Sequence, residues 1–382
     1  MVKPLYDVTI SGASLSGASL GLLLAQRGYR VMLLEKETFP RDKVCGEGLF
    51  PQGVELLDRI GLLPAVRVAG AVPFHSLQIL SGSAHAVMSL ERGAGLLFTR
   101  RAADAAVAQA AGKAAGLTLR QGAPVETIDR NNDHITVGTG GPKSDRIRTR
   151  ILVVAEGARS RTRRLLNIGA RPVDARRFGL RAHLRGAWAA PGQVDIHLGS
   201  HGEAYVAAQH EQSSVTLLLH GKKEHRPGVC ASSKGDLREF FHRQISEFPA
   251  LRPRADQIDF CTEPVATAPL AVAVDETACH RAILVGDAAG SMDPILGQGM
   301  TVALLDACNA ASVIDGALAR NDCSQRALQE YSRRRHQYFA GPRRMAAALE
   351  WIARHPAAAG PLVSLLENRP NLRRIFLKLA LA

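Results

Sequence analysis

The first 35 residues combine two short strand-like runs with one longer helical run. The stretch "DVTIS" (residues 7–11) is rich in β-formers, and "RVMLLE" (30–35) is nearly all apolar, as expected of a parallel strand buried on both faces. Between them, "GASLGLLLAQRG" (17–28) predicts a helix that ends at Gly28, because glycine is favoured just after a helix C-terminus. The segment therefore predicts a strand–helix–strand unit with parallel strands.

The same pattern returns twice, on either side of a region with a different pattern. Strand–turn–helix patterns recur over residues 148–169 and 281–314, and residues 125–139 predict a β-hairpin. Between about residues 173 and 261, short stretches alternate apolar and polar positions, which indicates an antiparallel sheet. From about residue 325 the chain is helical and polar.

These patterns predict an α/β protein with a discontinuous Rossmann-like domain, an inserted antiparallel-sheet domain and a C-terminal helical region. The expected limits are residues 1–75, 95–172 and 265–325 for the Rossmann-like domain, 76–94 and 173–264 for the inserted, substrate-facing domain, and 326–382 for the helical region.

The first strand and helix are joined by "GASLSG" (12–17), which is close to the dinucleotide-binding pattern G-x-G-x-x-G. Gly12 would make the turn and Gly17 would allow close packing of helix on strand, while Ser14 replaces the middle glycine. A pyrophosphate would lie at the helix N-terminus, where free N–H groups and the helix dipole favour an anion. Glu35 ends the second strand, where a carboxylate can accept hydrogen bonds from ribose hydroxyls.

Two later motifs complete the pattern: "ILVVAEGARSRTRR" (151–164) and "AILVGDAAGSMDPILGQGM" (282–300). Together with the N-terminal turn they resemble the FAD-dependent family of class A flavoprotein monooxygenases and geranylgeranyl reductases. The resemblance implies a glutathione-reductase-like FAD domain, with Asp287 on the flavin ribityl and ribose hydroxyls. It places Glu156-Gly157 where the family has Asp-Gly. It also puts Arg100 at the pyrophosphate, with Arg101 as the competing candidate.

The implied FAD-binding residues are Gly12, Ala13, Ser14, Leu15, Ser16, Gly17, Glu35, Lys36, Arg41, Cys45, Gly46, Arg100, Val125, Glu156, Gly157, Gly286, Asp287, Pro294, Gly297, Gln298, Gly299 and Met300. The last four would point a helix N-terminus at the flavin pyrimidine, where it stabilises the negative charge of the reduced ring.

The stretch "FPRDKVCGEGL" (39–49) resembles the P-x-x-K-x-C-G-x-G loop of geranylgeranyl reductases and their bacterial relatives. Three roles for Cys45 stay open. It could be a small residue packed under the loop, a proton donor whose pKa is lowered by Arg41 and Lys43, or a covalent attachment point for flavin. The packing role is the default for a single cysteine.

The family resemblance implies two reactions. One is hydroxylation of an apolar, electron-rich, phenolic or polyketide-like molecule through a flavin C4a-hydroperoxide, with O2 as oxidant and NAD(P)H as a transient reductant. The other is reduction of a C=C bond in an isoprenoid or lipid-like substrate, with Cys45 as proton donor. A third hypothesis is a membrane-associated electron carrier. Strand alternation suggests that Arg181 and His183 face the substrate, and Tyr205 lies in the stretch that takes the place of the reductases' substrate motif.

Composition and charge bear on partners. The 382 residues are 46% hydrophobic and 22% charged, with a net charge of +13. The last 63 residues hold twelve Lys and Arg against four Asp and Glu. No nucleic-acid motif accompanies this charge, which disfavours nucleic acid as a partner. The tail "NRPNLRRIFLKLALA" instead pairs apolar residues at helical spacing with basic ones, which is compatible with peripheral contact with a membrane.

The cysteines and the N-terminus suggest a reducing compartment and a cytoplasmic location. The six cysteines, Cys230 among them, are scattered without a C-x-x-C pair, and no His or Cys spacing indicates a metal site. No signal peptide precedes the first strand. Nothing in the sequence indicates an oligomeric state.

Overall fold

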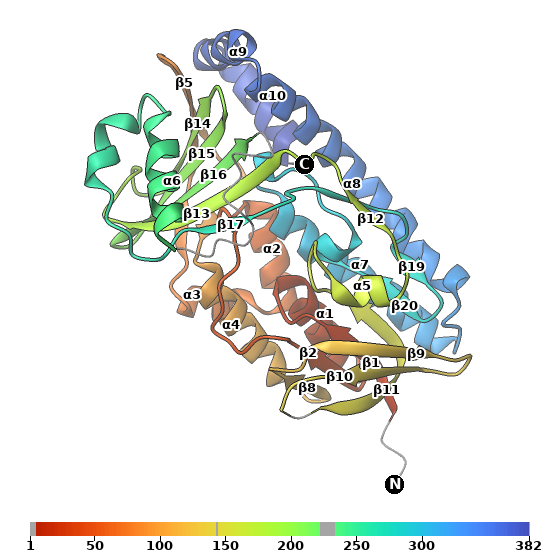
Figure 1. Ribbon diagram of the computed structural model, residues 1–382. Coiled ribbons are helices and arrows are strands. Elements are labelled where there is room, and N and C mark those ends of the chain that lie inside the picture. The colour runs from red at the N-terminus through yellow and green to blue at the C-terminus, as the bar shows by residue number, and fades with distance from the viewer. Residues whose placement is uncertain (1–4, 143, 222–233, 382) are drawn as a thin grey trace.

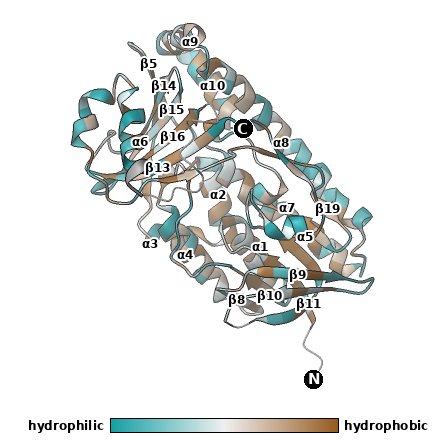
Figure 2. Ribbon diagram, viewed as in Figure 1, coloured by the Kyte–Doolittle hydropathy of each residue, from teal (hydrophilic) through white to brown (hydrophobic). Residues whose placement is uncertain are grey.

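The computed structural model describes residues 5–142, 144–221 and 234–381, and Cys230 lies outside them. Figure 1 shows two sheets at opposite ends of the molecule, with helices packed beside them and a row of C-terminal helices running along one side. Hydrophobic residues are frequent on the strands of both sheets, whereas hydrophilic residues are frequent on the outer helices (Figure 2). The predicted fold class is confirmed, since parallel and antiparallel sheets occur together with a C-terminal helical segment.

The first sheet is eight-stranded and mostly parallel. Strand β1 (Leu5–Ser11) lies at its centre between β2 (Val31–Leu34) and β11 (Asp145–Val154), both parallel to it. The sheet is completed by β8 (Leu117–Arg120), β20 (Ala282–Leu284), β19 (Ala278–Cys279), and the hairpin of β9 (Val125–Arg130) and β10 (Ile135–Thr139). The predicted strand–helix–strand unit and hairpin are therefore both present.

Helices α1 (Leu15–Ala25), α4 (Arg100–Gly112) and α7 (Gly299–Ala319) pack together beside this sheet. Most of α1 is buried, because the helix carries apolar or small residues on every side. Helix α7 is long and apolar enough to span a membrane by length and composition, but 56% of its apolar window is buried inside the protein. This degree of burial is typical of a helix in the core of a folded domain.

The second sheet has seven strands, in the order β17-β13-β16-β15-β14-β5-β6. The strands are β5 (Ser76–Ser81), β6 (Ala84–Ser89), β13 (Arg177–Arg185), β14 (Gln193–Gly199), β15 (Gly202–Gln209), β16 (Gln212–His220) and β17 (Val265–Thr267). Helix α6 (Lys234–Ser246) packs on one face through Phe241 and Ile245. The opposite face, with Val194 and Ile196, is turned toward a cavity. The domain limits stay a prediction, and β17 shows that this sheet extends past residue 264.

Shorter elements connect the two sheets. They are α2 (Pro51–Ile60), α3 (Leu63–Val68) and α5 (Arg161–Leu165); the three-stranded sheet of β3 (Gly48–Leu49), β4 (Val72–Phe74) and β7 (Gly95–Leu97); the pair β12 (Ala170–Pro172) and β18 (Val272–Val274); and the 3-10 helices η2 (Arg252–Gln257), η3 (Gly286–Ala289) and η4 (Pro294–Leu296).

Three helices form the C-terminal region and contact both halves of the molecule. Helix α8 (Gln325–Ala353) packs on α7, and α9 (Pro356–Asn368) packs on β5 and β6 of the second sheet. Helix α10 (Pro370–Leu381) packs on α8 and α9. Proline begins both α9 and α10, where its missing N–H costs nothing. The helical region is therefore part of the fold and bridges its two sheets.

His197 predicts an acid sensitivity of the second sheet. It lies on β14, on the face away from the cavity, and neither ring nitrogen has a hydrogen-bond partner among the described residues. Burial lowers the pKa of His197 from 6.5 to about 4. Between these two values the unfolded chain binds a proton that the folded chain does not, so stability falls as the pH falls. The slope from this group is about 1.4 kcal/mol per pH unit.

In urea unfolding at pH 7, 5.5 and 4.5, the free energy of unfolding of His197→Leu should fall less steeply with falling pH than that of the wild-type protein. The difference in slope should be about 1.4 kcal/mol per pH unit. His336→Leu is the control, because His336 is exposed on α8. Equal slopes for wild type and His197→Leu would contradict this account of His197.

Candidate functional site

The turn after β1 requires its two glycines. Gly12 has a φ of +104°, and a Cβ there would lie 2.4 Å from the carbonyl oxygen of Ala155. A Cβ on Gly17 would lie 1.9 Å from the carbonyl oxygen of Gly12. Helix α1 begins at Leu15 with no side chain capping its N-terminus and no acidic residue in its first turn. Its free N–H groups can therefore receive an anion, as the sequence predicts.

Several predicted cofactor side chains gather around this turn. Arg100 donates 2.7 Å to the hydroxyl of Ser14 and pairs with Asp104 at 2.9 Å. Arg41 lies 3.2 Å from Asp104 and 3.4 Å from Glu35, and Glu35 also accepts the N–H of Ala13 at 3.1 Å. Lys36 instead points to solvent, with its side chain 69% exposed beside Glu37.

The charges in this group support one another. Burial alone would raise the pKa of Asp104, but the guanidinium groups of Arg100 and Arg41 hold it below its ordinary value. Burial opposes the charge of Arg100, yet Asp104 and the nearby Cys45 raise its pKa above the usual range. Both groups therefore stay charged, and the arginine can bind a pyrophosphate. Arg101, the competing candidate, is exposed.

The loop after β20 is held at both of its ends by one buried ion pair. Asp306 of α7 accepts the N–H of Gly286 at 2.8 Å, and Arg335 of α8 donates to the carbonyl oxygen of Gly290 at 2.7 Å. The two side chains contact each other at 3.1 Å and are both nearly inaccessible. Between these two ends, Asp287 lines the cavity. The predicted ribityl contact at Asp287 is thus on a loop fixed by residues that sequence patterns do not single out.

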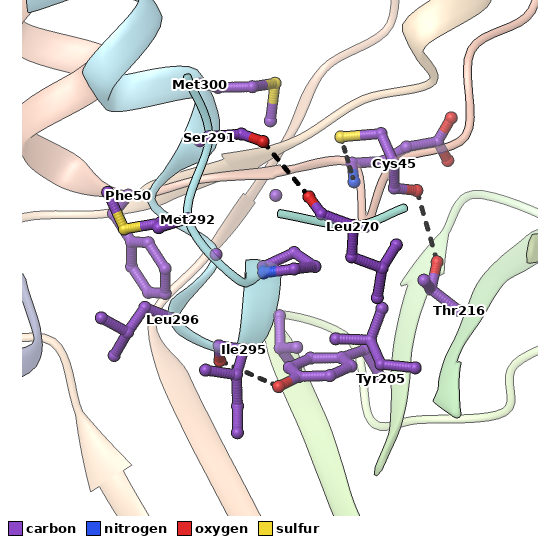
Figure 3. A pocket seen from close by; sticks show the side chains of 18 of the residues that line it. Cys45, Phe50, Tyr205, Thr216, Leu270, Ser291, Met292, Ile295, Leu296 and Met300 are labelled. Carbon is purple, nitrogen blue, oxygen red and sulfur yellow. Dashed lines mark hydrogen bonds between the residues drawn. The ribbon is translucent and has the colours of Figure 1, made fainter. Parts of the chain in front are cut away.

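A second buried network holds the loop before α7. Arg177 of β13 pairs with Asp293 and with Glu203 of β15, the latter at 2.6 Å. The hydroxyl of Tyr205 donates 2.8 Å to the carbonyl oxygen of Ile295, as Figure 3 shows. Burial first, and then the neighbouring Glu203, raise the pKa of Tyr205 well above its ordinary value, so it stays a neutral phenol. These contacts attach the second sheet to the loop at the start of α7.

Helix α7 begins where the sequence predicts a helix start, and its N-terminus lies at the cavity. Gly297 is in the left-handed region at φ +66°, which a side chain rarely adopts. Helix α7 begins at Gly299 with no side-chain cap and no acidic residue in its first turn. Pro294, Gly297, Gly299 and Met300 line the cavity. The side chain of Gln298 turns away and donates to the carbonyl oxygen of Ala380 at 3.3 Å.

Glu156 and Val125 have structural contacts of their own. The carboxylate of Glu156 accepts hydrogen bonds from Ser11, Ser160 and Thr162, and so fastens β1 to the start of α5. Gly157 has a φ of +80° and lines the cavity next to it. The side chain of Val125 is buried in an apolar cluster under the first sheet, which leaves only its backbone for a cofactor contact.

The loop of residues 42–48 lies across the cavity, and Cys45 lines it. The Cys45 carbonyl oxygen accepts from Thr216 at 3.3 Å, and its Sγ lies 3.4 Å from the N–H of Glu47 (Figure 3). Lys43 reaches 3.5 Å from Asp287 across the cavity. Lys43 was not predicted as a site residue. It is the lysine of the P-x-x-K-x-C-G-x-G loop motif, so the motif could have identified it.

Arg181 and His183 hold this loop from behind. Arg181 donates 2.8 Å to Asp42, and Nε2 of His183 lies 2.7 Å from the carboxylate of Glu47. Glu47 also accepts the N–H of Arg100 at 2.9 Å and is fully buried. Arg181 lies opposite Thr216, on the sheet face that the sequence pattern indicates, but the loop lies between it and the cavity. Of the three predicted substrate residues, only Tyr205 lines the cavity.

The cavity itself has a volume of about 460 Å³ and two ends of different character. One end is polar and meets the N-termini of α1 and α7, with Lys43, Arg100 and Asp287. The other end lies between the second sheet and the C-terminal helices and is apolar. We call it the apolar chamber; it is lined by Phe74, Leu77, Ile79, Met88, Val194, Ile196, Leu198, Leu362, Val363, Leu366, Phe376, Leu377 and Ala380.

The polar end fits FAD. Two uncapped helix N-termini face it, and Ser16, which lines it, has a buried hydroxyl with no hydrogen-bond partner among the described residues. Gly286, at φ +59°, brings the backbone close to Ser16. Arg100 and the α1 N-terminus would hold the pyrophosphate, Asp287 the ribityl chain, and the α7 N-terminus the flavin pyrimidine. The individual contacts between these residues and FAD stay predictions.

Comparisons with known proteins agree with this site. A family model described as "FAD binding domain" matches residues 5–341. Conditioned medium factor receptor 1 of Dictyostelium discoideum is 27% identical over 96% of this chain and 74% of its own length. Kynurenine 3-monooxygenase of Salinispora arenicola is 27% identical over 85% of this chain and 75% of its own length. The crystal structure of pqsL, a probable FAD-dependent monooxygenase from Pseudomonas aeruginosa, has a TM-score of 0.77 at 22% identity, over 94% of this chain and 99% of its own.

Because the Asp306–Arg335 pair holds the loop at residues 286–290, we expect Arg335 to affect FAD affinity without contacting FAD. Lysine at position 335 keeps the charge but cannot bond Asp306 and the Gly290 carbonyl with one planar group. Losing one hydrogen bond of a charged group costs about 1.5 kcal/mol, so Arg335→Lys should raise the FAD dissociation constant about tenfold. Quenching of FAD fluorescence measures this constant.

Arg333→Lys is the matched control, since Arg333 lies on the same helix in an exposed pair with Glu330. If both variants bound FAD equally well, the loop would not depend on the buried pair.

Proposed function

The chain belongs to the FAD binding domain family and is an FAD-dependent oxidoreductase of the flavoprotein monooxygenases, and on that premise we propose its reaction and substrate class. It oxygenates an uncharged, largely aliphatic molecule held in the apolar chamber, with O2 as oxidant and NAD(P)H as a transient reductant. The substrate class is inferred from the side chains that line the cavity.

The absence of ionic groups from the described lining of the apolar chamber carries the proposal. The charged side chains that line the cavity are Lys43, Glu47, Arg100, Glu156, Arg159 and Asp287, and they come from the loops and helix start that build its polar end. The hydroxyls of Tyr205 and Thr216 are already bonded to backbone carbonyl oxygens. A charged substrate would therefore lose its hydration without gaining a partner.

Binding must instead come from burial of apolar surface, at about 25 cal/mol per Å². This lining supports an aliphatic substrate better than the phenolic one that the sequence suggests. In the apolar chamber a phenol would find two phenylalanine rings, Phe74 and Phe376, among many aliphatic side chains.

The residues of this chain then have three tasks. The α7 N-terminus stabilises negative charge on the ring that it faces. The loop of residues 42–48, fixed by Glu47 and Arg181, closes one side of the cavity. The C-terminal helices close the other side and exclude water from the chamber. When bound, the flavin supplies the electron transfer and oxygen chemistry.

A second candidate is C=C reduction, which the position of Cys45 favours. Its thiol lines the cavity close to Arg100, and its Sγ accepts from the Glu47 N–H at 3.4 Å. In this reaction Cys45 would donate a proton to one carbon of the double bond, and a bound flavin would supply the hydride for the other. No oxygen atom would enter the product.

A single-turnover experiment under ¹⁸O2 separates the two reactions. FAD-loaded protein is reduced with NADPH, mixed with geranylgeraniol as an uncharged olefin, and the product is analysed by mass spectrometry. We expect one ¹⁸O atom in the product, and a Cys45→Ala variant within about threefold of the wild-type yield. A product two hydrogens heavier without ¹⁸O, lost at least 100-fold in Cys45→Ala, would establish the reductase. No conversion by either route would contradict both candidates.

A further inference from the structure

The C-terminal helices expose a row of large apolar side chains. Leu372, Ile375 and Leu379 follow one another at helical spacing on α10 and are 37%, 52% and 56% exposed. Leu365 on α9 is 46% exposed, and Trp351, near the end of α8, is 58% exposed. Helices α8, α9 and α10 contact one another. We call these five residues the outer apolar row.

Helices α9 and α10 also line the apolar chamber, with the faces that are turned away from solvent. Val363 and Leu366 of α9 and Leu377 and Ala380 of α10 are nearly inaccessible and face the cavity. Helix α9 packs directly on β5 and β6, and both of these strands also line the chamber. One layer of helix therefore separates the chamber from the outer apolar row, a thickness of about 10 Å. Figure 1 shows this layer at the edge of the molecule.

Basic residues accompany the outer apolar row. Arg369, Arg373, Arg374 and Lys378 lie on or beside α10, and residues 369–381 contain no acidic residue. Two of these arginines also fix the helix: Arg373 donates to the carbonyl oxygen of Val87, and Arg374 pairs with Glu91, both outside the C-terminal region. The combination of exposed aliphatic side chains and cationic ones suits an anionic lipid surface.

We propose that the outer faces of α9 and α10 bind an anionic phospholipid bilayer, and that the apolar substrate enters the chamber from this bilayer past the helix pair. The binding surface is inferred from the exposed apolar and basic residues of α9 and α10, whereas the entry route rests on the proposed function. Helix α10 has twelve residues, too few to span a bilayer, so the contact is peripheral. A second copy of the chain fits this surface less well, because its own basic residues would face each other.

Vesicle co-sedimentation of the FAD-loaded protein tests the surface. The probes are phosphatidylcholine vesicles and vesicles with 30% phosphatidylglycerol, at low and high salt. We expect at least tenfold tighter binding to the anionic vesicles, weakened by salt. The variant Ile375→Glu/Leu379→Glu should lose at least tenfold in this binding, because it places charge where aliphatic side chains would enter the lipid.

The matched control is Val68→Glu/Val173→Glu, which changes two exposed valines outside the C-terminal helices that are 90% and 64% exposed. It should bind vesicles like the wild type. All proteins must first show equal FAD content, so that a folding defect is not mistaken for lost lipid binding. Equal binding to both kinds of vesicle, or full binding by Ile375→Glu/Leu379→Glu, would overturn the proposal. A dimer that this variant abolishes, without vesicle binding by the wild type, would assign the surface to self-association instead.

The entry route has a separate test, which distinguishes its failure from failure of the proposed function. With geranylgeraniol in detergent micelles, Ile375→Glu/Leu379→Glu should turn over like the wild type, because neither residue lines the cavity. With the same alcohol in anionic vesicles, the variant should be at least tenfold slower. Equal rates from vesicles would overturn the entry route. Conversion by neither protein under either condition would count against the proposed function.

Discussion

Buried arginines fix the loops that surround the cavity, and four of them do so while paired with an aspartate. Arg100, Arg177, Arg181 and Arg335 are each at most 5% exposed. Their partners are Asp104, Asp293, Asp42 and Asp306. A buried guanidinium is costly unless it is paired and fully hydrogen-bonded, and its planar group can bond two partners at once. Each loop is therefore restricted to arrangements in which its arginine stays paired with its aspartate, and the cavity keeps its shape because four such pairs hold together.

The arginines also explain how distant parts of the chain share one site. Arg335 brings α8 to the loop at residues 286–290, and Arg177 brings the second sheet to the loop before α7. Helices α9 and α10 then close the apolar chamber over the second sheet. The C-terminal region thus contributes both to the support of the flavin loops and to the wall of the chamber. The polar end and the apolar chamber form one cavity because these helices span both sheets.

The sequence could predict the features that depend on short segments of the chain. The glycine turn at residues 12–17, the hairpin at 125–139 and the helix start at 299 each follow from local pattern, and the structure contains all three. The pairs that fix the loops could not be predicted, since Glu47 and His183 are 136 residues apart and Arg335 and Asp306 are 29 apart.

Alternation along β13 gave the correct face for Arg181 and His183, yet a loop from elsewhere in the chain covers that face. Sequence alternation specifies the side of a strand, and it does not specify what packs against it.

The central claim is that one cavity accepts FAD at its polar end and an uncharged aliphatic chain in its apolar chamber. Titration of the FAD-loaded protein with straight-chain alcohols of 8 to about 16 carbons, followed by the change in flavin absorbance, tests it most directly. Each added methylene should tighten binding about fourfold until the chamber is full, and the carboxylate of equal length should bind at least tenfold more weakly. Affinity that does not depend on chain length, or tighter binding of hydroxybenzoate than of any alcohol, would contradict the account.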